Sequence, residues 1–259
     1  MKKLLIAAAL LIAGKGLIAQ DGENNLKNFR FGLKVAPSFN WLRPDDKKTV
    51  KDGSVAGIKY GLITEFRLNN VASFVTGIEG SHLGGKLAYP DTAFYFVHDD
   101  AFISKEDTAG HKADLQTYIL NNRTFKVTYV TIPITLKLKS KEIGSMTYFG
   151  FFGGEMNFRA GAKASDKNTN FIVPSGSSFD PTKVDIAKDM NIFAVNLNVG
   201  GGIEYNLSGS TSFTTSIHYN RGFLSNTKAD SEYLLKPDGT PYKQKAFMDG
   251  IAITVGMLF

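Results

Sequence analysis

The sequence predicts an all-β protein, an eight-stranded antiparallel up-and-down transmembrane β-barrel with four long extracellular loops and short periplasmic turns. Three observations predict this fold. Eight segments alternate apolar and polar residues with a period of two, and the connections between them alternate between long and short. The chain also holds 26 glycines and 20 phenylalanines but no cysteine. Period-two alternation is typical of strands with two different faces, and an even number of strands allows closure without free edges.

The composition narrows the class of protein before any motif is considered. The 259 residues are 43% hydrophobic and 21% charged, which is typical of a folded chain. The absence of cysteine excludes disulfides, thiolate metal sites, cysteine nucleophiles and a lipidated N-terminal cysteine. The net charge of +6 falls to +3, from 27 basic and 24 acidic residues, if Lys2, Lys3 and Lys15 leave with a signal peptide. So small a charge gives no argument for a nucleic-acid partner.

The first segment has the order of a secretory signal peptide. Two lysines follow Met1, ten apolar residues run from Leu4 to Ala13, and Ala19 offers a small residue for cleavage. We therefore expect a signal peptide at 1–19, an N-terminal periplasmic segment at 20–28 and an outer-membrane β-barrel domain at 29–259. The alternative for the first segment is a buried N-terminal helix.

Each strand is predicted from its own alternation. The eight expected strands cover residues 29–41, 58–68, 74–81, 125–138, 147–159, 193–207, 213–220 and 250–259. In the fourth, Phe125, Val127 and Tyr129 have the opposite parity to Ile132 and the residues after it, so we expect a bulge near Val130. In the fifth, Phe149 and Phe151 fall on the polar face.

The connections give a second, independent indication. Long connections are expected at 43–57, 85–124, 161–191 and 222–246, and short ones at 69–70, 140–145 and 208–210. Outer-membrane barrels have short periplasmic turns and longer extracellular loops. Both chain ends then lie on the periplasmic side.

The composition of the two faces indicates where each points. The polar face mixes small residues with charges that can pair inside a narrow barrel: Arg30, Lys34, Lys59, Glu65, Arg67, Glu79, Lys137, Glu155, Arg159 and Glu204. The apolar face carries rings near strand ends, as an aromatic girdle would: Trp41, Tyr60, Tyr129, Tyr148, Tyr205 and Tyr219. The alternative is a secreted lipocalin-like carrier, in which the apolar face would line a ligand cavity. Because eight strands leave an interior just wide enough for side chains, a porin-like channel is not expected.

Five stretches of the chain resemble the PorT family of outer-membrane β-barrel proteins. They are FRFGLKVAPSFNWL, YVTIPITLKLK, YFGFFGGEMNF, VNLNVGGGIEYNL and GIAITVGMLF. The most recognisable pattern comprises Tyr129, Ile132, Pro133, Leu136 and Lys137, and the chain departs from the family where Thr131 replaces a frequent glutamate. The last strand, with Val255, Met257 and Phe259, is similar to the C-terminal signal read by the barrel-assembly machinery.

The resemblance implies a fold, a location and a set of partners. The expected location is the outer membrane, with its lipid and the barrel-assembly machinery as partners. A third expected partner is an envelope or secretion protein bound through the long loops. A non-enzymatic structural or partner-binding role follows, associated with type IX-like protein secretion, without a cofactor or nucleic acid.

Few side chains are candidates for chemistry. His218 is expected to face inward, as a hydrogen-bonded interior histidine rather than a catalytic one. The stretch 98–111 offers His98, Asp99, Asp100, Glu106, Asp107 and His111 as cation ligands, but its spacing matches no known metal motif. Asp91-Thr92-Ala93 and Asp107-Thr108-Ala109 look like bacterial O-glycosylation acceptors, and 43–52 is a loop that could contact lipopolysaccharide head groups.

Motifs of common enzymes are absent from the sequence. It contains no G-x-S-x-G, H-E-x-x-H or P-loop, and Gly200 to Gly202 lie inside a strand pattern rather than in a phosphate-binding turn. We therefore expect no catalytic, cofactor-binding or metal-binding residues. An outer-membrane hydrolase or acyltransferase that uses His218 or His98 remains the alternative.

Overall fold

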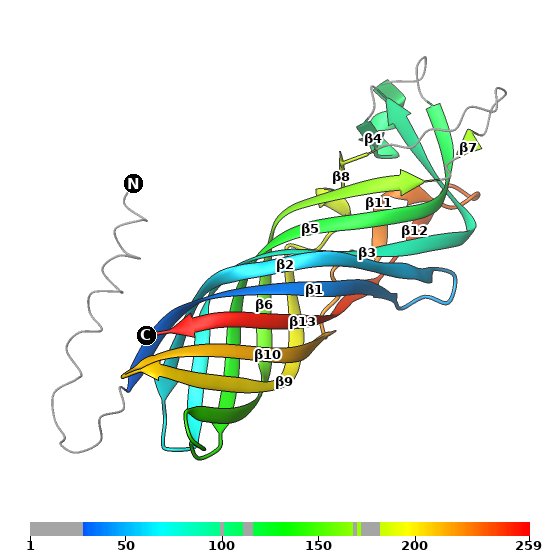
Figure 1. Cartoon of the computed structure of the whole chain (residues 1–259). Coiled ribbons are helices and arrows are strands. Elements are labelled where there is room, and N and C mark those ends of the chain that lie inside the picture. Colours follow the sequence, from blue (N-terminus) through cyan, green and yellow to red (C-terminus); the bar gives the residue numbers. More distant parts are fainter. Residues whose placement is uncertain (1–27, 99–100, 111–115, 168–169, 172–181) are drawn as a thin grey trace, which may run out of the picture.

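The barrel is formed by eight long strands. The computed structural model describes residues 28–98, 101–110, 116–167, 170–171 and 182–259 (Figure 1). The barrel strands are β1 (Phe29–Pro44), β2 (Val50–Arg67), β3 (Ala72–His98), β5 (Gln116–Lys139), β6 (Met146–Lys167), β9 (Phe193–Ser208), β10 (Thr211–Gly222) and β13 (Ala246–Leu258). Each predicted strand is confirmed. Most of them continue several residues beyond the predicted bounds, at the end that carries the long connections.

Hydrogen bonding closes the sheet completely. Each of the eight strands pairs antiparallel with the next one along the chain, including β3 with β5. The last strand, β13, pairs with the first, β1. In Figure 1 the first strand and the last therefore lie side by side, with Leu33 opposite Met257. Closure removes the edges at which an open sheet would aggregate.

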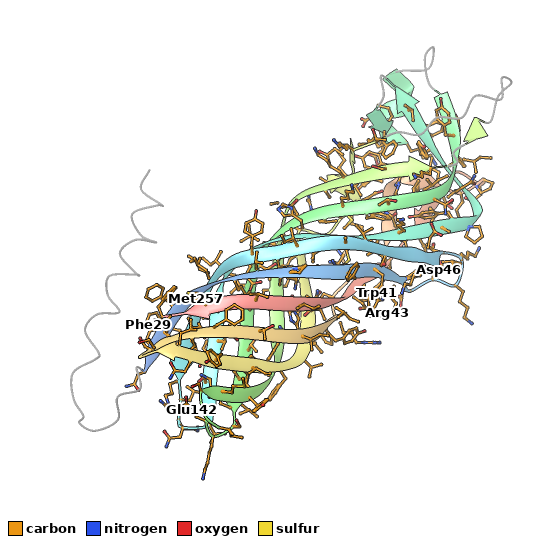
Figure 2. The ribbon with its side chains drawn as sticks, in the orientation of Figure 1. Phe29, Trp41, Arg43, Asp46, Glu142 and Met257 are labelled. Carbon is orange, nitrogen blue, oxygen red and sulfur yellow. The ribbon has the colours of Figure 1, made fainter. Side chains whose placement is uncertain are left out.

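The two ends of the barrel differ. We call the end with the connections 68–71, 140–145 and 209–210 the turn end, and the opposite end the loop end. Figure 2 places Phe29, Met257 and Glu142 at the turn end, and Trp41, Arg43 and Asp46 toward the loop end. Since β1 begins and β13 ends at the turn end, the described chain starts and finishes there, as predicted.

The outward and inward faces have opposite chemistry in the half of the barrel near the turn end. Phe39 is 63% exposed, Ile78 62% and Leu62 56%, whereas Lys59, Glu79 and Glu155 are buried inside. The outward apolar residues of β1 run from Phe29 to Trp41. At about 3.3 Å per residue and a tilt of about 40°, they span roughly 30 Å, the thickness of a bilayer core. The apolar face therefore points outward, and the lipocalin-like arrangement is wrong.

Several local expectations differ from the structure. Residues 50–57, 85–98 and 116–124 were expected in loops but continue β2, β3 and β5, which leaves only 45–49 between β1 and β2. Tyr129 is 1% exposed and points inward, so it is not a girdle residue. From Arg123 to Lys137 the alternation along β5 is unbroken. The irregularity in its pairing lies between Thr128 and Tyr129, opposite Gly161 and Arg159. A bulge therefore lies close to Val130, but β6 carries the extra residue, and the predicted change of parity within β5 is wrong.

The loop end carries a compact part that we call the head. It comprises the ends of three barrel strands, which are residues 82–98 of β3, 116–128 of β5 and 160–167 of β6. It also comprises the short elements β4 (Ala101–Ile103), η2 (Glu106–Gly110), β7 (Asn170–Phe171), β8 (Val184–Asp185), η3 (Ala187–Asp189), β11 (Asp230–Leu235) and β12 (Pro241–Lys243). Its buried apolar residues form one core with those of the upper barrel, among them Leu87, Tyr95, Phe102, Phe125 and Leu234.

Within the described ranges, no helix is long and apolar enough to cross a membrane. The predicted signal peptide at 1–19 and all but Asn28 of the predicted segment 20–28 lie outside the described residues.

Candidate functional site

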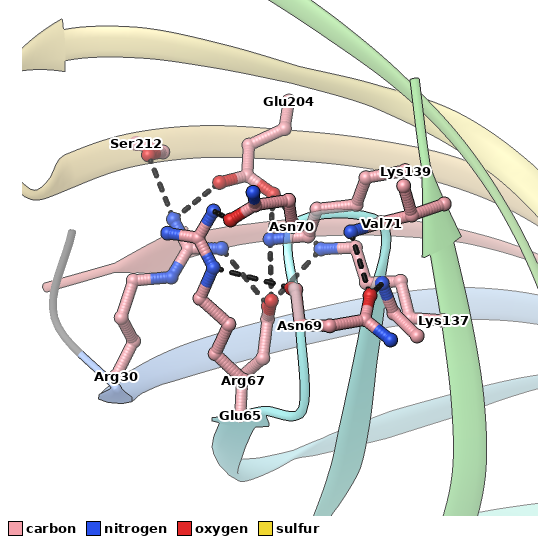
Figure 3. A network of polar contacts seen from close by, with 11 residues as sticks. Arg30, Glu65, Arg67, Asn69, Asn70, Val71, Lys137, Lys139, Glu204 and Ser212 are labelled. Carbon is pink, nitrogen blue, oxygen red and sulfur yellow. Dashed lines mark hydrogen bonds and ion pairs between the residues drawn. The ribbon is translucent and has the colours of Figure 1, made fainter. Parts of the chain in front are cut away.

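The inward side chains nearest the turn end form an ion-pair network drawn from four strands (Figure 3). Arg30 Nη2 lies 3.0 Å from Glu65 Oε2, and Arg30 also binds Glu204. Lys137 Nζ lies 2.9 Å from Glu204 Oε2 and 3.2 Å from Glu65 Oε2. Lys139 contacts the same two carboxylates. Three cations thus share two carboxylates, which ties β1, β2, β5 and β9 together across the lumen.

Arg67 extends this network toward the turn end. Its Nε donates to the carbonyl oxygen of Asn69 at 3.2 Å, and its Nη2 donates to Asn70 Oδ1 at 3.2 Å. In the same turn, Asn69 Oδ1 accepts the backbone N–H groups of Val71 and Ala72. The guanidinium therefore stabilises the turn between β2 and β3, and its charge borders a cavity of about 210 Å³ at the mouth of the barrel.

The middle of the lumen holds two separate ion pairs. Lys34 Nζ lies 2.6 Å from Glu79 Oε1, and Lys59 Nζ lies 2.7 Å from Glu155 Oε2. Each pair joins strands that are not neighbours. The prediction that inward charges pair is confirmed for eight of the ten residues, since Arg67 binds amide oxygens and no partner is found for Arg159 Nε within the described chain.

The lumen is filled rather than open. A cavity of about 90 Å³ lies between the middle pairs and the turn-end network, and Glu65 borders both this cavity and the mouth. Phe149 and Phe151 point into it, as their parity predicted, and Lys137 Nζ lies 4.2 Å from the centre of the Phe149 ring. The arrangement can hold a few water molecules and cross-link strands, as expected for eight strands.

A fully buried ion pair lies in the head. Arg123 donates from Nε and Nη2 to the two carboxylate oxygens of Asp166, at 2.7 and 2.8 Å. The guanidinium also lies 4.8 Å from the centre of the Phe102 ring. Burial alone would lower the pKa of Arg123, but the charge and hydrogen bonds of Asp166 raise it above its usual value. The Arg123 guanidinium is therefore charged at every physiological pH.

A second buried carboxylate organises the rest of the head. Asp189 accepts hydrogen bonds from Ser231 Oγ at 2.7 Å and from the backbone N–H of Glu232 at 2.6 Å. These contacts fix the start of β11 against η3. Burial, helped by the negative charge of Asp189, raises the pKa of Tyr233 to about 12.

Of the two candidate catalytic histidines, His98 and His218, the structure describes the side chain of His218. His218 faces the lumen as predicted and is 6% exposed, but its Nδ1 has no hydrogen-bond partner in the described chain, which differs from the hydrogen-bonded histidine expected. Its ring packs 5.8 Å from that of Phe151. Gly200 lies inside β9, where a Cβ atom would come within 2.5 Å of His218 Cβ, so the glycine run serves packing.

The candidate ligands of 98–111 are only partly described. Glu106 and Asp107 lie in η2, and Asp107 Oδ2 accepts a hydrogen bond from Ser104 Oγ at 2.7 Å. Asp99, Asp100 and His111 lie outside the described residues. In the described part of the chain, no group of three metal-binding side chains occurs. Of the predicted glycosylation triplets, Thr108 is placed, and its hydroxyl donates to the carbonyl oxygen of Lys105.

Thr131, where the PorT family often has glutamate, is fully buried. Its hydroxyl donates to Asn157 Oδ1 at 2.8 Å and lies 2.9 Å from Ser81 Oγ.

The Arg123–Asp166 pair was not predicted from the sequence, because both residues were assigned to loops. Arg123 has the same odd parity as Lys137 on β5, which was the one available indication that it also points inward.

The comparison with protein families agrees with this architecture. A family model described as outer membrane protein beta-barrel domain matches residues 18–228. No curated protein matches the sequence. Among solved structures, Neisserial surface protein A is 10% identical with a TM-score of 0.41, covering 90% of this chain and 96% of that chain. Outer membrane protein OprG from Pseudomonas aeruginosa is 10% identical with a TM-score of 0.39, covering 92% and 99%. The outer membrane protease OmpT from Escherichia coli is 11% identical with a TM-score of 0.36, covering 93% and 99%. The chain therefore belongs to the outer membrane protein β-barrel family, and its barrel spans the outer membrane.

Proposed function

We propose that the protein is a non-enzymatic, PorT-like component of the outer membrane. Its closed barrel would anchor a rigid extracellular head that binds an envelope or secretion protein of the type IX kind. One observation carries the proposal: a single apolar core runs from the upper barrel into the head. A head held in this way loses little conformational entropy when a partner binds, which favours binding.

The lumen supports an anchoring role rather than transport. Two carboxylates and three cations cross-link four strands at the turn end, and further pairs cross the middle. A solute would have to break several buried ion pairs to pass, each at a cost of several kcal/mol. The lumen is therefore proposed to be closed to solutes.

The last strand also indicates how the barrel would be assembled. The outward residues of the last strand end in Val255, Met257 and Phe259, in the pattern that resembles the assembly signal. We infer that the barrel-assembly machinery inserts the protein through this strand, after cleavage of the signal peptide at 1–19.

The test uses the native host and position-specific cross-linking. A photoreactive amino acid replaces Glu232 or Lys243, which are exposed on the head, or Glu142 at the turn end as the matched control. The proposal predicts one defined protein adduct from the head positions and a different pattern from Glu142. A gene deletion should also reduce the release or surface display of secreted proteins, and expression of the unchanged gene should restore it.

Three results would contradict the proposal. The first is a head that gives no adduct although the barrel is folded, as judged by the change in gel mobility on heating. The second is solute-dependent swelling of liposomes that contain the purified protein. The third is a hydrolase or acyltransferase activity that disappears in the His218→Ala variant.

A further inference from the structure

A groove of about 690 Å³ lies on the wall where β2, β3, β5 and β6 pass from the membrane-facing half into the head. Three lysines border it, and all three are exposed: Lys126 on β5, Lys163 on β6 and Lys183 just before β8. Among the described residues, none of these ammonium groups has a carboxylate within ion-pair distance. Within the described chain, the groove therefore concentrates positive charge without a counterion.

The placement of these lysines is unfavourable for the isolated protein. Lys126 and Lys163 are direct cross-strand partners in the β5–β6 pairing, an arrangement in which like charges repel. Lys183 has a φ of 60°, a left-handed conformation that a residue with a Cβ atom rarely adopts. Strain and like-charge crowding that coincide at one groove indicate a site that gains from a bound anion.

The described polar groups beside the three lysines have other hydrogen-bond partners. Asp185 is in register with Lys163, but its Oδ1 accepts the backbone N–H of Ala187 at 2.7 Å. Ser165 Oγ accepts the backbone N–H of Lys183 at 3.2 Å, which holds that residue over β6. His82 Nδ1 lies 3.1 Å from Thr128 Oγ1, so an imidazole and a hydroxyl complete the floor of the groove.

The height of the groove identifies the kind of anion. Val130 is the last exposed apolar residue on the outward face of β5, and Thr128 and Lys126 follow it. Four residues of a strand tilted by about 40° rise roughly 10 Å, which places the Lys126 Cα at or just above the head-group layer. A lysine side chain can bend back to that layer while its stem covers apolar surface. The outer leaflet of this membrane presents phosphorylated glycolipid at this level.

We propose that this groove binds a phosphate group of an outer-leaflet glycolipid of the lipid A type. The phosphate would lie between Lys126 and Lys163, with Lys183 closing the outer side, and would relieve the repulsion between the paired ammonium groups. The acyl chains would pack against the outward apolar residues below, beginning with Ile58 of the groove itself. The bound lipid would fix the orientation of the barrel wall that supports the head.

The experiment measures lipid affinity of the purified full chain in detergent micelles. The probe is bisphosphorylated lipid A, titrated by thermophoresis and checked by native mass spectrometry. A basic residue near a lipid head group contributes about a factor of five to binding, so the triple change K126Q/K163Q/K183Q should weaken binding about 100-fold. The matched control K228Q/K236Q/K243Q removes the same charge from the head and should change the affinity less than threefold.

Further arms separate the glycolipid from other anions. Wild-type protein should lose most of its affinity for lipid A whose phosphates have been removed. Phosphatidylglycerol that binds as tightly as lipid A, or inorganic phosphate that displaces lipid A at equal concentration, would overturn the proposal. An unchanged affinity in the triple variant would also overturn it. Should the triple variant fail to fold, Lys163→Gln alone relieves the crowded pair and should still weaken binding about fivefold.

Discussion

The buried ion pair of the head allows a direct test of what holds the head together. Arg123 and Asp166 are fully buried and joined by two parallel hydrogen bonds. The Asp166→Asn variant preserves the shape of the carboxylate but leaves the Arg123 cation without an opposite charge. Removing one partner of a buried pair costs about 3–5 kcal/mol. We therefore expect the population of the locally opened head to rise at least 100-fold.

The assay must measure local opening of the head and not unfolding of the barrel. Limited proteolysis in detergent reports local opening when cleavage is slow compared with reclosing. The expected result is faster cleavage within 101–110, in β4 and η2, because Phe102 packs against the Arg123 guanidinium. The gel mobility of the unheated barrel should not change, since the contact lies where β5 and β6 enter the head, outside the membrane-facing half of the barrel.

Two further variants complete the test. In R123M/D166L both charges are replaced by apolar side chains, which is often neutral or stabilising, so protection should return to near the wild-type level. Lys228→Gln breaks an exposed pair with Glu232, which lies 2.9 Å away, and should change the cleavage rate less than fivefold. If Asp166→Asn were cleaved at the wild-type rate, the pair would not hold the head together.

Four other predictions concern separate parts of the molecule. Lys59→Met leaves Glu155 charged and buried in the lumen, so the midpoint of barrel unfolding in urea should fall by an amount equivalent to about 3 kcal/mol; an unchanged midpoint would contradict the pairing. Gly200→Val should reduce the yield of heat-modifiable barrel, because even a Cβ atom there meets backbone at 2.5 Å, and normal yield would show that β9 can shift. Trp41, the single tryptophan, should be quenched more by lipids brominated near the head group than by those brominated at the chain end, since it lies at the outer edge of the apolar band. Because the pKa of Tyr233 is raised to about 12, the folded head retains a proton that the unfolded chain loses above about pH 10, so protease resistance should fall between pH 10 and 12, and less so in Tyr233→Phe.

The membrane-facing half could be predicted from the sequence because one rule holds there throughout. Lipid outside requires apolar outward residues, and the narrow lumen accepts charges that pair, so alternation identifies each strand. β1 follows this rule, with Phe31 and Leu33 on its outward face and Arg30 and Lys34 on its inward face. The partners inside could not be predicted, since they depend on which strands face each other across the lumen. Lys59 and Glu155 lie on β2 and β6, 96 residues apart.

The head could not be predicted because the same rule reverses there. Phe125, Val127 and Tyr129 are apolar and point inward, whereas Lys126 points out. If apolar residues always faced lipid, these three residues would have to point outward, and β5 would need a bulge before Ile132. The structure has no such bulge in β5. The extra residue is Ala160 on β6, which lies opposite Thr128 and Tyr129. Alternation alone cannot show whether an alanine faces inward or outward.

The reversal has a physical cause that also locates the membrane surface. On β5 the inward row is continuous from Lys137 to Arg123, yet it changes from polar to apolar at Tyr129. The outward row changes in the opposite sense at the same level, from Val130 to Lys126. Where water replaces lipid outside, the exterior must become polar, and stability then requires an apolar interior. The neighbouring β3 changes at His82, which is opposite Thr128 in the pairing. This exchange lies directly below the lysines of the groove. The same reversal that made the head hard to predict from the sequence therefore puts those lysines at the level that we propose for the lipid phosphates.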